Sequence, residues 1–507
     1  MSKSIEVHKF GGASLADMDA VSQAVSIIQE QPRPLVIVVS AMAGVTDALL
    51  ETARSATAGD ESRVQTAVAG LRKRHERVAI ALLPDGRARR QVLSSIAESF
   101  DELLSLGHGL AILRELTPRT QDYLLARGER LSARLIAAVL AARRLKSVYV
   151  DALEVVHTDD NYGNASPEFQ GTDRAARAAL LPILQQGIIP VIPGFIGRTP
   201  DGYVATLGRG GSDLTATLLA RALRAAAVNL WKDVPGLLTA DPRIVPDAHV
   251  IPHLTPREAA ELAYYGAKVL HPRALIPISD RAIPVRVRPF SEPHAAGTEI
   301  SRRRTLRKYP VKAISSISGQ ALVTVTGNGM LGVPGIAARA FEALHNQGVS
   351  VSLISQASSE HSICFSVPEA SAQIAKSALL AAFRSEIVHR EIDGVEVRKG
   401  VDILAIVGQG MSGTPGIAAR MFEALAGGGI NIVAIAQGSS ELNISTVVDA
   451  TAAAGALQRM GAFTKSFDHP VGAATAPTGK FLFLTNNEQD SGGPRLFRFG
   501  NCHCHKR

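Results

Sequence analysis

The sequence predicts an α/β protein, with a parallel-core sheet covered by helices over residues 1–300 and two α+β domains after it. Short apolar, β-branched runs alternate with longer helical patterns up to about residue 300, which is typical of a parallel sheet. A basic and polar stretch, SRRRTLRKYP, then has the composition of a linker. Beyond it, one segment occurs twice without a gap, starting at Met330 and again at Met411. We therefore expect one large sheet domain followed by two related smaller domains.

Four segments of the first domain carry a strand pattern. IEVHKF, residues 5–10, is expected to be the first strand of the sheet. The runs Pro34–Ala41, Ile188–Phe195 and Ala226–Trp231 are apolar on both faces, which predicts central strands covered by helices on each side. Residues 58–142 are mostly helical in pattern and are expected to form a lobe over one edge of the sheet.

The repeated segment predicts two similar domains, at residues 316–395 and 400–468. Each copy runs from a strand through a Gly/Pro turn to a helix, PGIAARxFEAL, and then to a second strand. One copy alone is too small for a good core, so the two are expected to pack side by side. Residues 469–507 are rich in Gly, Pro and polar residues, which predicts a disordered tail. The CHCH motif in this tail lacks a second ligand pair, so no metal site is predicted there.

Composition narrows the function classes. The chain has 507 residues and only three cysteines, too few for a disulfide framework, so a reducing cytoplasm is predicted. It shows neither a secretory leader nor an uncharged apolar run of about 18 residues, so no membrane span is expected. The net charge is +8, but the arginines are spread through helical patterns without interleaved aromatic residues. We therefore predict solvated helix faces and no nucleic-acid partner.

Lys9, Gly11 and Gly12 are expected at the carboxyl end of the first strand, where ligands of open α/β sheets bind. Two glycines let backbone N–H groups approach phosphate oxygens, and a lysine adds a mobile charge for a transferring phosphoryl group. An ordinary strand–helix turn beside a surface lysine is the alternative. The chain has no G-x-x-x-x-G-K-[ST] motif, so it is not a P-loop protein.

Two further loops favour the phosphate site over an ordinary strand–helix turn. In TLGRGGSD, Ser212 or Asp213 is expected to cap a strong helix, but capping alone does not require Arg209 or three glycines. An arginine beside exposed N–H groups suits a carboxylate, and a nearby acid can organise lysines and metal-bound phosphate. VVSAMAGVTD adds Ser40 and Thr46 as hydroxyl donors at another strand end. Three such loops predict a site for a phosphate and a carboxylate.

Six motifs, in this order and spacing, closely resemble the aspartate kinases of the amino-acid kinase superfamily. They are KFGGAS, VVSAMAGVTD, GFIG, GRGGSD, DVPGLLTADPR and GAKVLHPRA, and the resemblance spans residues 5 to about 460. The repeat is similar to the paired ACT regulatory domains of this family. The resemblance implies ATP-dependent phosphorylation of the β-carboxylate of L-aspartate to 4-phospho-L-aspartate, the first step of lysine, threonine and methionine biosynthesis.

The resemblance also implies roles for single residues, each by its motif. Lys9 would neutralise the transferring phosphoryl group, Asp213 would orient Lys9, and Arg209 would pair with the α-carboxylate of aspartate. Glu129, in ARGERLS, would hold the substrate ammonium. Mg²⁺ would be held mainly through ATP, without a protein metal site. The pocket would be completed by Ser40, Thr46 and Ser212, and ATP would be contacted by Lys9, Gly11, Gly12, Lys232, Asp233, Arg243 and Lys268.

Two positions depart from the family pattern. Lys232 stands where the family usually has a threonine, and Leu238 stands where a tyrosine often lies beside the nucleotide. The adenosine contacts are therefore the part of the implied site that the motifs support least.

The loops LISQASSEHSI and AIAQGSSELNI resemble those of the threonine-sensitive members, many of which are fused to a homoserine dehydrogenase. This chain ends about where that second enzyme would begin. Gln356 and Gln437 occupy the same position in each repeat and match the threonine-binding glutamines of that group. An amide both donates and accepts hydrogen bonds, which suits an amino acid. A polar strand end is the alternative for both, and lysine is the second choice of effector. Pairing of the ACT-like domains predicts a homo-oligomer.

Two other functions compete with this one. A kinase of the same superfamily could act on glutamate or a nucleotide, but GRGGSD and the tandem repeats argue against it. A catalytically silent, amino-acid-binding regulatory protein is the other alternative. Intact Lys9, Arg209 and Asp213 argue against that function, although Lys232 and Leu238 leave some room for it.

Overall fold

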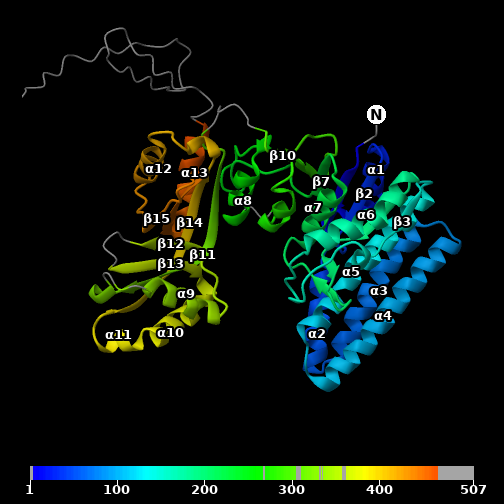
Figure 1. Cartoon of the computed structure of the whole chain (residues 1–507), viewed down its shortest axis with the longest axis horizontal. Coiled ribbons are helices and arrows are strands. Elements are labelled where there is room, and N and C mark those ends of the chain that lie inside the picture. The colour runs from blue at the N-terminus through cyan, green and yellow to red at the C-terminus, as the bar shows by residue number, and fades with distance from the viewer. Residues whose placement is uncertain are drawn as a thin grey trace, which may run out of the picture.

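The computed structural model describes residues 4–266, 269–303, 310–330, 333, 335–356 and 361–465. Figure 1 shows two bodies: an N-terminal body drawn from blue to green, and a C-terminal body drawn from yellow-green to orange. Helix α8 (Pro256–Tyr264) lies between them (Figure 1).

The N-terminal body is built on an eight-stranded sheet in the order β3-β4-β2-β1-β7-β9-β10-β8. All neighbouring strands in it are parallel except β9 and β10. The predicted parallel core and its central strands are therefore confirmed, while the β9–β10 pair makes the complete sheet mixed. The strands are β1 (Glu6–Phe10), β2 (Leu35–Val39), β3 (Ser147–Tyr149), β4 (Ile189–Pro193), β7 (Ala227–Lys232), β8 (His253–Leu254), β9 (Val285–Pro289) and β10 (Thr298–Ile300), with a separate hairpin of β5 (Ile196–Arg198) and β6 (Val204–Thr206).

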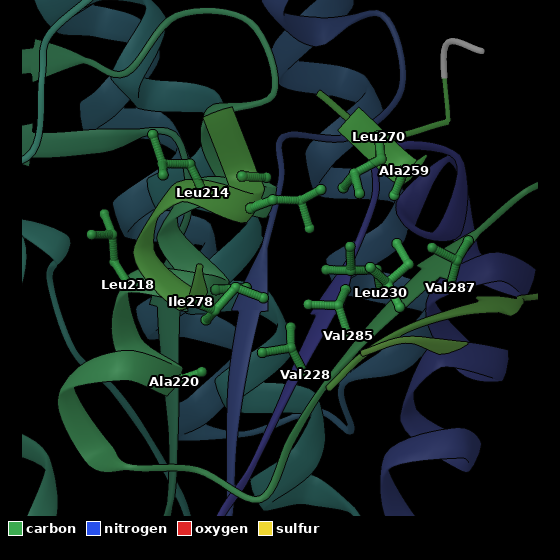
Figure 2. Close-up of a cluster of buried hydrophobic side chains, with 14 of the residues drawn as sticks. Leu214, Leu218, Ala220, Val228, Leu230, Ala259, Leu270, Ile278, Val285 and Val287 are labelled. Carbon is green, nitrogen blue, oxygen red and sulfur yellow. The ribbon is translucent and has the colours of Figure 1, made fainter. Parts of the chain in front are cut away.

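Helices cover this sheet, and the predicted helical lobe is formed by α3, α4 and α5. Side chains alternate along β1, so Val7 joins the apolar core under α7, whereas Phe10 joins the core under α1 and α2. Figure 2 shows part of the first core, where side chains of α7, α8, β7 and β9 meet. The helices are α1 (Met18–Glu30), α2 (Val45–Ala58), α3 (Glu61–Leu82), α4 (Arg87–Leu113), α5 (Pro118–Ala142), α6 (Phe169–Gln185) and α7 (Gly211–Leu223), with short 3₁₀ turns η1 (Ala13–Leu15), η2 (Ala152–Glu154) and η3 (Pro272–Ile278).

The C-terminal body has one six-stranded antiparallel sheet in the order β12-β13-β11-β14-β16-β15. Each repeat supplies three of its strands and its own helices. The first repeat has β11 (Ala313–Thr326), η4 (Asn328–Met330), α9 (Ile336–Asn346), β12 (Leu353–Gln356), β13 (Ser362–Pro368), η5 (Glu369–Ser371), α10 (Ala372–Ala382) and α11 (Arg384–Val388). The second has β14 (Gly394–Val407), η6 (Gln409–Met411), α12 (Ile417–Ala426), β15 (Ala434–Ala436), β16 (Asn443–Asp449) and α13 (Ala450–Lys465).

The two repeats exchange strand segments. β11 and β14 pair along their whole length, with Ala313 opposite Val407 and Thr326 opposite Gly394. Ile314, at the start of β11, therefore packs in the core of the second repeat, while Val395, at the start of β14, packs in the core of the first. Each core is completed by a strand from the other copy, so the repeats form one folding unit.

Helix α8 joins the two bodies through Glu258, whose side chain is fully buried. Its carboxylate accepts a hydrogen bond from the Thr255 backbone N–H at 2.8 Å, and the Thr255 hydroxyl oxygen accepts one from the Glu258 N–H at 3.3 Å, which together form a capping box. The Thr255 hydroxyl also donates to this carboxylate at 3.0 Å. The same carboxylate binds the Lys312 ammonium at 2.9 Å and the Gln409 N–H at 2.8 Å, both from the C-terminal body. The Glu258 carboxylate thus caps the start of α8 and also binds Lys312 and Gln409 of the C-terminal body.

We predict that Glu258→Ala lowers the free energy of unfolding by about 3 kcal/mol, because it leaves buried donors and the Lys312 ammonium without their acceptor. Urea unfolding followed by circular dichroism measures this, with Glu342→Ala on the exposed face of α9 as the matched control. If the Glu258 variant unfolds at the same urea concentration as the wild type, the contact between the two bodies does not depend on this carboxylate.

Candidate functional site

The predicted phosphate loops meet at one edge of the sheet. β1 and β2 are parallel neighbours, and the Ser40 N–H donates to the Phe10 carbonyl at 3.1 Å just beyond their ends. The Ala43 N–H donates to the Gly12 carbonyl at 3.1 Å. A Cβ on Gly12 would lie 3.1 Å from the Ala41 carbonyl oxygen, so a side chain there would push the two loops apart. Glycine at this position therefore serves close packing of the loops.

The third loop leads into α7 through Gly210, which has φ 74° and a left-handed conformation that favours glycine. Gly210 is the N-cap residue, so the prediction that Ser212 or Asp213 caps this helix is wrong. The glycine turn starts the helix earlier and places Ser212 and Asp213 inside its first turn, both buried. There the positive end of the helix dipole favours the Asp213 carboxylate.

Asp213 binds two lysines from neighbouring strands. Its Oδ1 lies 2.8 Å from the Lys9 Nζ of β1, and its Oδ2 lies 2.6 Å from the Lys232 Nζ at the end of β7. The exposed fractions of the side chains are only 7% for Lys9, 5% for Asp213 and 16% for Lys232. The structure therefore brings together three residues that the sequence analysis selected from three different motifs.

The cluster shifts the pKa values of Asp213 and Lys9. Burial by itself would raise the pKa of Asp213, but the positive charges of Lys9 and Lys232, with their hydrogen bonds, lower it to about 2. Burial lowers the pKa of Lys9, and the charge of Lys232 acts in the same direction, while Asp213 opposes both. Asp213 is thus ionised at neutral pH, and the two ammonium groups share one counterion.

Glu129 lies in α5 and is almost completely buried. Burial raises its pKa to about 7, against the hydrogen bond from the Ala41 backbone and the charge of Lys9, which both lower it. Its Oε2 has no hydrogen-bond partner among the described residues. A buried carboxyl group with a free oxygen beside these loops is suited to accept a proton or a ligand cation.

Two structural residues of the site were missed by the sequence analysis. Asp122 is fully buried in α5 and accepts hydrogen bonds from the Gly163 N–H at 2.8 Å and from the Thr206 N–H at 2.7 Å and hydroxyl at 2.8 Å. Arg273 donates to the carbonyls of Leu207 at 3.0 Å and Ala165 at 2.8 Å. Asp122 lies in none of the six motifs, whereas Arg273 lies within GAKVLHPRA but was given no role there. The partners of both residues are distant in sequence, so their contacts gave no local signal.

The other predicted residues differ in their exposure. Arg209 and Asp233 are exposed, while Ser40 and Thr46 are half-buried in the loop after β2 and the first turn of α2. Arg209 stands near His271, because its charge contributes to lowering the pKa of that histidine, after burial and Arg273.

Arg243 is exposed and pairs with Asp241 of its own loop at 2.6 Å, and no contact with the lysine cluster occurs within the part of the chain that the structure describes. Lys268 lies outside the described residues.

Gln356 and Gln437 are both exposed, at the end of β12 and just after β15. These edge strands approach each other, since the Ser355 hydroxyl donates to the Ile435 carbonyl at 2.9 Å. The structure therefore brings the two glutamines to neighbouring strand ends, far from the lysine cluster in sequence and in a different body.

None of the helices in the described residues is long and apolar enough to cross a membrane. No group of three or more His, Cys, Asp or Glu side chains is placed there to hold a metal ion.

Comparison with protein families identifies the class of domain at this site. Residues 4–289 match the model of the amino acid kinase family, and residues 323–383 and 404–461 each match an ACT domain. The site described above lies within the first match, and each repeat contains one of the ACT matches.

Comparison with individual proteins identifies the kind of amino acid kinase more closely. The chain is 36% identical over 451 residues to a chloroplastic bifunctional aspartokinase/homoserine dehydrogenase 1 of Arabidopsis thaliana, covering 87% of this chain and 49% of that protein. A crystal structure of E. coli aspartokinase III in complex with aspartate and ADP matches with a TM-score of 0.76 and 30% identity, covering 90% of this chain and 99% of the other. A second structure of that enzyme, with lysine and aspartate, matches with a TM-score of 0.74 and 31% identity, covering 91% and 100%.

The chain belongs to the aspartokinases of the amino acid kinase family. This confirms both the predicted fold class and the resemblance on which the residue roles were based. The chain spans about half the length of the bifunctional relatives that it matches.

We predict that Glu129→Gln becomes more stable than the wild type as the pH rises. The pKa of Glu129 is raised from 4.5 to about 7 on folding, so the folded state holds this proton more tightly. Its contribution to stability is present below pH 4.5 and is lost as the pH rises to about 7, by up to about 3 kcal/mol. Glutamine resembles the protonated acid and does not titrate.

Urea unfolding of both proteins at several pH values between 5 and 8.5 tests this, with Glu342→Gln as the exposed control. A constant difference between the Glu129 variant and the wild type across this range would show that Glu129 has an ordinary pKa.

Proposed function

We propose that this chain is an aspartate kinase that transfers the γ-phosphoryl group of ATP to the β-carboxylate of L-aspartate. The product would be 4-phospho-L-aspartate, in the first step of lysine, threonine and methionine biosynthesis. One observation carries the proposal: Lys9, Asp213 and Lys232 form a buried cationic cluster at the sheet edge where the glycine loops meet. Membership of the aspartokinases supports it, as does the E. coli relative described in complex with aspartate and ADP. The three cysteines suit a cytoplasmic location.

At the acceptor end, Arg209 would bind the α-carboxylate of aspartate and Glu129 its ammonium group. Ser40, Thr46 and Ser212 would complete this part of the pocket. The raised pKa of Glu129 means that a substrate ammonium would draw this carboxyl group into its ionised form. Binding of aspartate near neutral pH would therefore release a proton from Glu129.

At the donor end, the predicted contacts to ATP are Lys9, Gly11, Gly12, Lys232, Asp233, Arg243 and Lys268. A β-carboxylate oxygen attacks the γ-phosphorus, the bond to the β,γ-bridging oxygen breaks, and ADP leaves. Neither group needs a proton transfer, so positioning and charge neutralisation are sufficient for catalysis. Mg²⁺ would arrive as part of the ATP substrate, since both oxygens of Asp213 are occupied by ammonium groups.

Regulation is the second part of the proposal. The ACT domains would bind an amino acid and pair between chains to form a homo-oligomer. Threonine is the favoured effector because Gln356 and Gln437 match the glutamines of threonine-sensitive members, and lysine is the alternative. The E. coli relative described with lysine shows that an amino acid other than threonine can occupy a member of this family.

We predict that the protein releases ADP with L-aspartate, ATP and Mg²⁺, and that Lys9→Met lowers kcat by about 10²-fold or more. Lys9 would act on charge that grows during transfer, so the loss falls on kcat. A coupled assay for ADP measures this, with Lys73→Met on the exposed face of α3 as the control. Faster ADP release with L-glutamate than with L-aspartate would overturn the substrate assignment.

We also predict that Gln356→Ala and Gln437→Ala each raise the threonine concentration for half-inhibition by about tenfold, because an amide contact to a charged ligand is lost. Activity without threonine should be nearly unchanged, since neither residue lies in the kinase body. Threonine and lysine titrations on both variants test this, with Gln373→Ala on α10 as an exposed control. Inhibition by lysine alone would reassign the effector.

A further inference from the structure

Lys232 is the least expected member of the lysine cluster, because threonine is usual at this position in the family. A threonine side chain carries no charge and cannot form an ion pair with Asp213, whereas the Lys232 ammonium binds its Oδ2 at 2.6 Å. This chain therefore places a second ammonium group on a carboxylate that already binds Lys9.

The charges of the cluster do not balance. One ionised carboxylate faces two lysines, and all three side chains are at least four-fifths buried. Glu129, the other buried acid beside Lys9, has its pKa raised to about 7 and so supplies only a fraction of a negative charge. Surplus positive charge in a poorly solvated site is costly to fold, and a bound anion would compensate it.

The two lysines lie at different depths. Lys9 is level with Leu230 of the adjacent strand, so Lys232 stands two residues further toward the carboxyl edge. Lys232 is also the more exposed of the two, at 16% against 7%. Glu129, the proposed ligand of the substrate ammonium, influences the pKa of Lys9. Lys9 is thus the inner cation, on the acceptor side, and Lys232 is the outer one.

The Lys232 ammonium group has N–H donors left for a further hydrogen bond. An ammonium group has three N–H donors, and Asp213 is the only partner that Lys232 has among the described residues. A phosphate oxygen could therefore bind Lys232 while the contact with Asp213 is kept.

From this arrangement we propose that Lys232 binds the β-phosphate and the β,γ-bridging oxygen of the nucleotide, where negative charge develops as ADP leaves. This inference rests on the proposed function for the identity of the donor nucleotide. Lys9 then neutralises the γ-phosphoryl group during its transfer, and Asp213 holds the two ammonium groups on one carboxylate. The chain would use a lysine at this position to stabilise the leaving group directly.

The test compares the two lysines, because both pair with the same carboxylate. We expect Lys232→Met to weaken ADP binding about tenfold, measured by calorimetry with Mg²⁺ and without aspartate. The kcat should fall by about tenfold or more, with the KM for aspartate changed less than about twofold. Lys9→Met should lower kcat but leave ADP affinity within about twofold, since ADP lacks the γ-phosphoryl group.

Two further variants separate this role from a structural one. Lys232→Arg keeps the charge and should retain ADP affinity within about threefold, whereas Lys232→Thr should behave like Lys232→Met. Neither neutral variant should lower the thermal midpoint, because Asp213 keeps Lys9 as its partner. Lys73→Met is the control for the loss of one positive charge.

Wild-type ADP affinity in Lys232→Met, or equal weakening by Lys9→Met and Lys232→Met, would overturn the proposal. Absence of ADP binding by the wild-type protein would also overturn it. If the wild type binds ADP but phosphorylates no aspartate, the acceptor assignment fails while the inference about Lys232 stands on the binding data.

Discussion

The pairing of one buried carboxylate with two ammonium groups is the interaction on which the rest of the site depends. Lys9 and Lys232 extend from adjacent parallel strands toward the same face of the sheet, so without Asp213 their charges would only repel. The first turn of α7 supplies that carboxylate where the helix dipole also favours negative charge. The sheet provides the cations and the helix provides the anion, so the position of α7 against the sheet sets the geometry of the cluster.

The position of α7 is fixed by packing and by buried polar contacts. Nearly every residue of α7 is buried, and Leu214 and Leu218 pack in the core shown in Figure 2. The hairpin before the helix is held by Asp122, which ties Thr206 to α5. Because α5 also carries Glu129, the same polar contacts set the distance between the acid that would bind the substrate ammonium and the lysine cluster. These contacts would therefore resist small displacements of α7, which carries Asp213, and of α5, which carries Glu129.

Much of this arrangement could be predicted from the sequence because its signals are local. Continuous apolar runs identified the central strands to within about two residues, and glycine loops identified the sheet edge. The predicted cap of α7 was wrong because the helix begins after Gly210, a glycine in a left-handed conformation, and not after a polar side chain.

Contacts between distant residues gave no such signal. The bonds of Asp122 to Gly163 and Thr206, the second lysine on Asp213 and the strand exchange between the repeats all depend on segments that meet only in the folded chain. Motifs can select the residues of a site, but only the fold decides which of them share a partner.

The same contacts would give α8 a physical part in the regulation proposed above. At its start, Glu258 is held by Lys312 and Gln409, which belong to the C-terminal body. Just after its end, the Tyr265 hydroxyl accepts a hydrogen bond from Ser445 on β16. Further along the chain, His271 packs against Gly210, where a Cβ would lie 2.4 Å from the histidine Cβ. A shift of the ACT sheet would thus act at both ends of one short helix and reach the glycine turn that starts α7. Since that turn sets the position of Asp213, an effector that favours another arrangement of the ACT domains could alter the lysine cluster without touching it.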